Sequence, residues 1–296
     1  MLRLGIIGLS PGNGHPYSWS AIFNGYDPVP METCGFPVIP RYLEQRRFPD
    51  DQIDGARVTH VWAQEPALAR HIAAAARIDT VVDRYEDMLG QVDAVLLARD
   101  DAERHVEFAM PFLKAGMPIY IDKPLALTCA EARQLFAAQK YPGQLFTCSA
   151  LRYAGEFQLS GADRAALGEI RQIHATTPKD WDKYAVHVIE PALLLAGDSE
   201  RVLRTHRWRE GESKTLAVSY AGGTQLLVSA LGAVAAPLAL RVIGDHGWKD
   251  LIFQDAFTAF RSALQAFVDS VRTRRPAIAE SFVMDVVALI EAGRTP

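Results

Sequence analysis

The segment with the clearest chemical implication lies near the N-terminus, where residues 8–15 read Gly-Leu-Ser-Pro-Gly-Asn-Gly-His. Glycines after a first strand let the backbone approach a pyrophosphate, and the next helix directs its amide groups at the anion. The usual G-x-G-x-x-G spacing is only partly met, because Ser10 stands where the second glycine would be. We expect this loop to hold the phosphates of a dinucleotide, with a plain surface turn as the alternative. Its candidate cofactor-binding residues are Gly8, Ser10, Gly12, Asn13 and Gly14.

Two features beyond this loop depart from the dinucleotide-binding pattern. The next apolar strand, residues 58–62, follows a long connection, whereas the whole strand–helix–strand unit usually takes ~30 residues. Residues 34–40 of that connection are expected to form an inserted loop near the cofactor edge. Ala63 then occupies the position where an acidic residue would bind the ribose hydroxyls. The missing acid weakens the preference for NAD and makes NADP, or no dinucleotide at all, more plausible.

The elements that must position the loop alternate along the first half of the chain. Short apolar runs predict strands, and segments with helical periodicity predict the helices between them. This alternation is typical of a parallel sheet covered by helices, so we expect residues 1–150 to form a Rossmann dinucleotide-binding domain. The predicted strands are 4–8, 58–62, 81–82, 93–98, 119–121 and 145–149, and the predicted helices are 66–77, a segment containing 106–113, and 129–139.

The second half has a different rhythm, which predicts an α+β domain over residues 151–296. Its strands should form a mostly antiparallel open sheet, and the turn at residues 221–223 should join two of them as a hairpin. A helix is expected to begin near Pro191, and the amphipathic stripe over residues 257–271 is interpreted as core. The predicted strands are 170–176, 202–208, 215–220, 225–229 and 238–243.

The overall charge bears on possible partners. A formal net charge of −4 argues against a general nucleic-acid binder, because phosphate binding needs clustered positive charge. Two groups of arginines do occur, and we interpret both as solvated faces with acidic neighbours rather than as polyanion sites. They are Arg41, Arg46 and Arg47 in the first half and Arg201, Arg204, Arg207 and Arg209 in the second.

The cysteines, the apolar runs and the histidines indicate the cellular compartment and whether a membrane span or a metal site is expected. Cys34, Cys129 and Cys148 lack the spacing of a zinc or redox site, which favours a reduced, cytoplasmic protein. The first apolar run is too short for a signal peptide, and no run approaches the ~20 residues of a membrane span. The eight histidines show no His-x-x-x-His pair, so no metal is expected.

An ordered series of segments, spread over nearly the whole chain, resembles the glucose–fructose oxidoreductase / inositol dehydrogenase (Gfo/Idh/MocA) family. Each segment is ordinary by itself, and their order and spacing carry the resemblance. The segment Ile121-Asp122-Lys123-Pro124 is similar to the family's Glu-Lys-Pro segment, with Asp in place of Glu. The other segments are 4–8, 93–98 with His105, Arg152-Tyr153, 167–170, 187–190 and 244–247.

The resemblance implies a Rossmann domain followed by an α+β domain, and NAD(P)-dependent oxidation or reduction of a sugar or cyclitol hydroxyl. It assigns Lys123 to the nicotinamide and substrate, and His187 to acid–base chemistry. Histidine suits that role, because its ordinary pKa of ~6.5 allows it to accept or return a proton at neutral pH. A lysine ammonium would stabilise the negative charge of the forming alkoxide.

The loop after the fourth strand and the start of the second domain supply further candidates. Arg99-Asp100-Asp101 stands where the family usually has Thr-Pro, and its carboxylates could bind hydroxyls but should repel a pyrophosphate. Lys183 stands where family members often have an aspartate, which would suit an anionic substrate; an exposed helix start is the alternative. His15 could act as an acid or base, although a loop histidine without a role is favoured. The remaining candidates are Arg99, Asp100 and His105 for the cofactor and Arg152, Tyr153, Lys183 and Tyr184 for the substrate.

The leading prediction is an NAD(P)-dependent oxidoreductase that acts on a sugar-like or polyhydroxylated small molecule and forms a dimer or tetramer. Two alternatives stay open. One is a relative that holds NAD tightly for transient oxidation during elimination or glycoside hydrolysis. The other is a degenerate, non-redox member that binds a ligand or partner.

Overall fold

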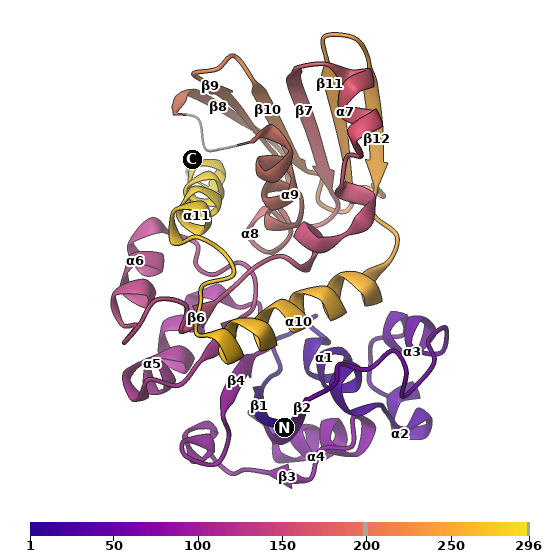
Figure 1. The fold of residues 1–296 in the computed structure, drawn as a ribbon, viewed down its shortest axis with the longest axis vertical. Coiled ribbons are helices and arrows are strands. Elements are labelled where there is room, and N and C mark those ends of the chain that lie inside the picture. The colour runs from indigo at the N-terminus through magenta and orange to yellow at the C-terminus, as the bar shows by residue number, and fades with distance from the viewer. Residues whose placement is uncertain (198–200, 295–296) are drawn as a thin grey trace. The chain divides into compact units, whose positions relative to one another are not determined.

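The computed structural model describes residues 1–197 and 201–294 and divides the chain into two compact units (Figure 1). The first unit comprises Met1–Ala126, Ala130–Thr147 and Phe260–Ala279. The second comprises Leu127–Cys129, Cys148–Ala259 and Glu280–Pro296. No described helix is both long enough and apolar enough to cross a membrane.

The first unit contains a six-stranded sheet in which every pairing is parallel. The strand order is β3-β2-β1-β4-β5-β6, the doubly wound order of Rossmann folds, with its switch point between β1 and β4. The predicted fold class of this half is confirmed. The strands are β1 (Leu2–Ile7), β2 (Ala56–Trp62), β3 (Thr80–Val81), β4 (Ala94–Leu97), β5 (Ile119–Ile121) and β6 (Leu145–Phe146).

Helices fill the connections between these strands largely where their periodicity predicted them. Ala69, Ile72 and Ala75 form the buried face of one of them, and Gly116 ends another in the left-handed conformation that glycine adopts without strain. The α-helices are α1 (His15–Asn24), α4 (Pro66–Ala75), α5 (His105–Ala115) and α6 (Cys129–Ala137), and short 3₁₀ helices lie at Tyr85–Met88 and Ala102–Arg104.

The long connection before β2 is more ordered than the inserted loop that we predicted. It contains α2 (Pro28–Glu32) and α3 (Val38–Leu43). Asp27 starts α2 by accepting a hydrogen bond from the Val29 amide, and Pro28 follows at a favourable first-turn position. A Cβ atom at Gly14 would lie 2.6 Å from Ile39 Cδ1 and 2.8 Å from Phe36 Cγ. The connection therefore packs closely against the glycine loop, which explains glycine at position 14.

The second unit contains a second six-stranded sheet, with the order β12-β11-β7-β10-β9-β8. Only β7 and β10 pair in parallel, so the predicted mostly antiparallel sheet is confirmed. The turn at residues 221–223 joins β9 to β10 as expected, whereas β12 was missed by sequence. The strands are β7 (Ile170–Thr177), β8 (Val202–Glu210), β9 (Ser213–Tyr220), β10 (Gln225–Ala230), β11 (Ala239–Gly244) and β12 (Trp248–Ile252).

The helices of the second unit include one whose predicted start was wrong. α9 begins at Val186 rather than near Pro191, because residues 186–190 are all buried and continue the same helix. The predicted strand 145–149 likewise ends early at Phe146, and Ser149 instead caps a 3₁₀ turn. The helices are α7 (Gly161–Leu167), α8 (Trp181–Tyr184), α9 (Val186–Ala196) and α11 (Glu280–Arg294), with 3₁₀ turns at Ala150–Tyr153 and Gly155–Phe157.

The long helix α10 (Ala256–Thr273) differs from the predicted division at residue 150, because most of it belongs to the first unit. Phe267 packs with its ring centroid 5.6 Å from that of Tyr120 and 5.7 Å from that of Phe146. Most of the predicted stripe is buried, including Leu264 and Val268. The apolar face of α10 therefore completes the core of the first unit.

Replacing this aromatic anchor should destabilise the first unit. Phe267 is 1% exposed, so Phe267→Ala leaves a large cavity and should lower the free energy of unfolding by about 3–5 kcal/mol. Urea denaturation followed by tryptophan fluorescence measures the change.

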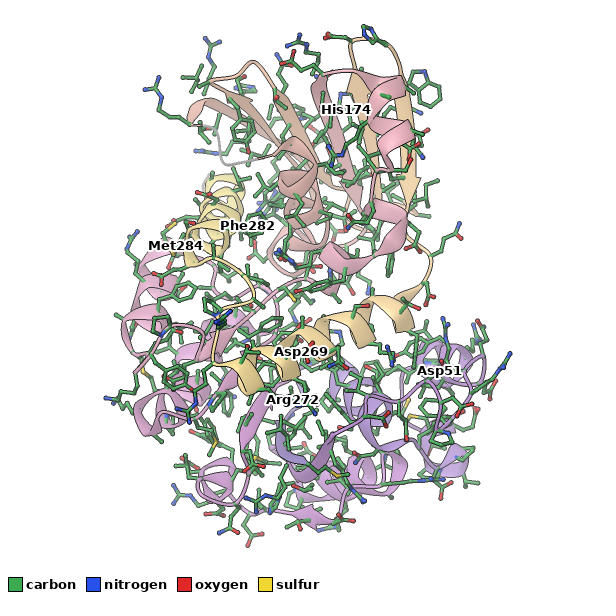
Figure 2. The ribbon with its side chains drawn as sticks, viewed as in Figure 1. Asp51, His174, Asp269, Arg272, Phe282 and Met284 are labelled. Atoms are coloured by element: carbon green, nitrogen blue, oxygen red, sulfur yellow. The ribbon has the colours of Figure 1, made fainter. Side chains whose placement is uncertain are left out.

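The matched control is Asp269→Asn, on the exposed side of the same helix (Figure 2). This substitution should change stability by no more than about 0.5 kcal/mol. Equal losses in the two variants would contradict the packing described for α10.

Candidate functional site

The carboxyl ends of β1, β4 and β5 bring three loops of the first unit to one edge of its sheet. In doubly wound sheets, ligands bind at this edge, outside the switch point. The loops carry most of the predicted cofactor residues, which are Gly8, Ser10, Gly12, Asn13 and Gly14 after β1 and Arg99 and Asp100 after β4. The loop after β5 carries Lys123, which was predicted to be catalytic.

Ser10, the residue that breaks the glycine pattern, is turned into the protein. Its hydroxyl donates to Asp100 Oδ1 at 2.6 Å and accepts from the Asp100 amide at 3.0 Å, and the residue is fully buried. Gly12 has φ +83°, and a Cβ atom there would meet no other atom within 4 Å. Pro11 and Gly12 are therefore the exposed residues of the loop, despite the serine at position 10, and the exposed surface of Gly12 is backbone.

Arg99 and Gln64 fix the start of the loop. The buried Arg99 guanidinium makes two hydrogen bonds to Asp101, at 2.9 and 2.6 Å, and donates to the Leu9 carbonyl at 3.0 Å. The Gln64 side-chain amide accepts from the Leu9 N–H and donates to its carbonyl. Gln64 follows the position of the expected ribose acid, and sequence reasoning gave it no role.

Asp122 connects the β5 loop to the start of α1. Its Oδ2 accepts from Asn13 Nδ2 at 2.8 Å and lies 2.6 Å from His15 Nδ1, and its Oδ1 accepts from the Lys123 amide. The His15 ring also stacks on Trp19, with centroids 4.8 Å apart. His15 does not lie in a loop as we expected, because it is the first residue of α1 and contacts Asp122. An acid–base role for His15 stays untested.

Lys123 lies beside a buried carboxylate of the neighbouring loop. Its Nζ is 3.6 Å from Asp100 Oδ2, and both side chains are 6% exposed. Asp101 faces Arg99 in the same way. Because each of these carboxylates faces a cation, the repulsion that we expected between them and a pyrophosphate is largely offset.

Two further cofactor candidates lie beneath this edge. His105 is fully buried, and its two ring nitrogens lie 2.9 and 2.8 Å from the carbonyl oxygens of Leu125 and Arg99. Ala63 is 4% exposed. His105 therefore positions the β4 and β5 loops, and a direct contact of either residue with a cofactor stays a prediction.

In the second unit, the candidate acid–base residue His187 lies on the first turn of α9. Its Nδ1 is 2.8 Å from the Ser149 hydroxyl. One turn along, Glu190 accepts from the Ser149 amide and pairs with Arg152 Nη1 at 2.6 Å. Sequence reasoning missed Ser149 and gave Glu190 no role, although Glu190 ends the quoted segment 187–190.

The Glu190 carboxyl is almost completely buried. Burial raises its pKa, and the Arg152 guanidinium and the Ser149 amide oppose that rise. The Arg152 guanidinium also lies 4.9 Å from the ring centroid of Phe282; Phe282 is labelled in Figure 2. Arg152 is thus held as the counter-ion of Glu190, a contact that its assignment to substrate did not anticipate.

The other predicted substrate residues lie around this group in the second unit. The Tyr184 ring packs edge-on against His187 at 5.5 Å, and Lys179 Nζ bonds the Tyr184 hydroxyl. The Lys183 amide donates to Asp180, the N-cap of α8. Burial raises the pKa of Tyr153, which keeps its phenol protonated. Contact of any of them with a substrate stays a prediction.

No metal centre is evident in the part of the chain that the structure describes, because no three His, Cys, Asp or Glu side chains there are grouped suitably to bind an ion. No disulfide involves Cys34, Cys129 or Cys148, and both Cys34 and Cys148 are buried.

The fold and the loop edge define the first unit as a doubly wound nucleotide-binding domain. Residues 40–149 match the Gfo/Idh/MocA family model, described as an oxidoreductase family with an NAD-binding Rossmann fold. A segment of 96 residues is 31% identical to an inositol 2-dehydrogenase of Acidothermus cellulolyticus. That segment covers 32% of this chain and spans only 28% of the relative.

Solved structures extend the likeness in fold to nearly the whole chain. The myo-inositol 2-dehydrogenase of Lactobacillus plantarum gives a TM-score of 0.76 at 15% identity, over 99% of this chain and 96% of that one. The UDP-N-acetylglucosamine 3-dehydrogenase of Acidithiobacillus ferrooxidans gives 0.73 at 16% identity over the same shares. The predicted resemblance to the Gfo/Idh/MocA family is confirmed.

The buried pair in the second unit generates a test of stability against pH. Arg152→Met removes the cation, so the pKa of Glu190 should rise further above its ordinary value of 4.5. A carboxyl whose pKa is raised in the folded state loses its contribution to stability as pH rises. The variant should therefore be only modestly destabilised near pH 5 and lose about 3–5 kcal/mol near pH 8, as measured by urea denaturation.

The double variant Arg152→Met/Glu190→Gln serves as the control, because it has no carboxyl to titrate at position 190. Its stability relative to the unmodified protein should be nearly independent of pH. If Arg152→Met loses the same free energy of unfolding at every pH, ionisation of Glu190 without its cation is not the cause of the destabilisation.

Proposed function

We propose that the protein is an NAD(P)-dependent oxidoreductase that acts on a hydroxyl or keto group of a sugar-like or polyhydroxylated small molecule. The observation that carries the proposal is the edge of the first sheet, where an exposed glycine-loop backbone and Lys123 stand at the switch point of a Rossmann fold. The match of this domain to an NAD-binding oxidoreductase family supports it.

The residues at this edge fit a dinucleotide. The exposed backbone at Gly12 can approach a pyrophosphate, because the Ser10 side chain points away and is bonded to Asp100. The charges of Asp100 and Asp101 are balanced by Lys123 and Arg99. We assign the phosphate site to the loop formed by Gly8, Ser10, Gly12, Asn13 and Gly14, with Gly12 as its exposed backbone contact, and a positioning role to Arg99, Asp100, His105 and Ala63.

His187 would move the proton of the reacting hydroxyl, and a nicotinamide cofactor, when bound, would supply the hydride chemistry. The Ser149 hydroxyl holds Nδ1 of the imidazole and so fixes the orientation of the ring. With Nδ1 engaged in this way, the exchangeable proton belongs at Nε2. A neutral imidazole accepts the hydroxyl proton during oxidation, and the imidazolium returns it during reduction.

Lys123 would supply positive charge for the alkoxide that develops as the proton leaves. The ammonium group is buried and lies beside Asp100, so its position is fixed before a ligand binds. A preorganised charge at a water-poor site stabilises a transition state more effectively than the same charge in water.

The matched relatives support a hydroxylated ring as substrate, because their names describe dehydrogenases of inositol and of UDP-N-acetylglucosamine. We assign Tyr153 and Tyr184 to hydrogen bonds with substrate hydroxyls, and Lys183 and Arg152 to the rim of that site. We also propose that the protein forms a homo-oligomer and that it is located in the cytoplasm.

Titration calorimetry with NADH and NADPH tests the cofactor assignment. One of them should bind, and Gly12→Asp, which adds a negative charge to the phosphate loop where space is open, should weaken it about tenfold or more. Absence of binding by both cofactors overturns the proposal. Binding without a net change at about 340 nm, over a panel of cyclitols and sugars, would instead support transient oxidation by a lyase-type enzyme.

Replacing His187, the proposed acid–base residue, should lower the catalytic rate without changing cofactor binding. On the substrate identified in that panel, His187→Asn should lower kcat by about 10²–10⁴-fold and leave the affinity for the cofactor unchanged. His174→Asn, on strand β7 of the same unit (Figure 2), is the control and should retain activity. Equal activity in His187→Asn and the unmodified enzyme is the result that rejects the assignment.

A further inference from the structure

The edge strand β8 of the second unit carries cations at positions that should be apolar. All nine of its residues are exposed. Arg207 pairs with Leu216 and Arg209 with Lys214 of β9, and residues opposite each other lie on the same face of a sheet. Leu216 is fully buried, so this is the covered face of the sheet. Two arginines therefore point toward the side on which apolar residues normally pack.

These arginines line a cavity of about 580 Å³ together with cations from two other elements. Lys214 comes from β9, and Arg294 comes from the last turn of α11. Within residues 1–197 and 201–294, no Asp or Glu is among the residues that line it. Its volume falls within the range of roughly 300–1,000 Å³ typical of small-molecule sites.

Four like charges around one cavity repel one another, and the repulsion is stronger than in bulk water. Asp182 offsets part of it, with its carboxylate 3.1 Å from Arg294 and 3.9 Å from Lys214. Inward-pointing charges on an edge strand can also serve to prevent aggregation. That role requires charges on β8 alone and does not explain why Lys214 and Arg294 converge on the same cavity.

We propose that this cavity binds a small molecule through its phosphate or diphosphate group. One arginine guanidinium can donate two parallel hydrogen bonds to phosphate oxygens, and lysine adds a point charge, so the cluster matches that group in charge and in donor type. The exposure of all nine β8 residues agrees with the solvated face predicted for Arg207 and Arg209, and the proposal adds an anion site at these two positions. The site lies wholly within the second unit and does not depend on the proposed oxidoreductase activity.

Titration calorimetry with inorganic pyrophosphate on the full chain tests the proposal. The unmodified protein should bind pyrophosphate, and Arg207→Gln/Lys214→Gln should weaken the Kd at least about tenfold. Binding should also weaken when NaCl is raised from about 50 to 500 mM. Arg209→Gln gives a second, single-site variant should the double variant fail to fold, as judged by circular dichroism.

Two controls locate the binding. Arg241→Gln removes an exposed arginine that pairs with Asp250 elsewhere on the same sheet, and it should leave the Kd unchanged. Gly12→Asp disables the glycine loop of the first unit, the other place where pyrophosphate could bind, and should leave this component of binding intact. The proposal would be overturned if pyrophosphate binding were lost in Gly12→Asp or persisted in Arg207→Gln/Lys214→Gln. It would also be overturned if the unmodified protein did not bind pyrophosphate. A role in self-association alone would also overturn it. In that case Arg207→Gln/Lys214→Gln would change the elution volume in gel filtration, and the unmodified protein would not bind pyrophosphate.

Discussion

The hydrogen bonds of the Asp122 carboxylate hold together the edge of the first sheet at which the β1, β4 and β5 loops meet. Asp122 stands at the end of β5, where it is 1% exposed, and it holds Asn13, His15 and the Lys123 amide together. A buried charge is costly unless its hydrogen bonds are satisfied, and removal of one partner leaves that cost in place. This constraint fixes the β1 loop relative to Lys123. The Ser10–Asp100 and Arg99–Asp101 contacts extend the same arrangement to the β4 loop.

The second unit uses the same physical device around a different residue. Glu190 is a buried carboxylate whose partners, Arg152 and the Ser149 amide, fix the segment that carries the Ser149 hydroxyl. That hydroxyl in turn orients His187. Lys123 contacts the buried carboxylates of Asp100 and Asp122 directly, and His187 is connected to the buried carboxylate of Glu190 through Ser149. Orientation is therefore set by groups that substrate need not touch.

Sequence predicted the strands of the first sheet well, because continuously apolar runs such as residues 94–97 are buried on both faces. The family resemblance also identified Lys123 and His187 as the candidate catalytic residues. Sequence did not predict the contacts that orient them, since Ser10 and Asp100 are 90 residues apart and Ser149 and Glu190 are 41 apart. The return of residues 260–279 to the first unit depends on aromatic packing against β5 and β6, which periodicity alone cannot reveal. The early start of α9 was missed because Pro191 resembled a helix start.

Hydrogen exchange by mass spectrometry, with and without NAD(H), tests most directly whether the loop edge of the first sheet is the cofactor site. The amides of residues 8–15 and 121–126 should exchange more slowly when the cofactor is present, because bound pyrophosphate and nicotinamide restrict these loops. Unchanged exchange in both segments, with protection elsewhere in the chain, would contradict the account.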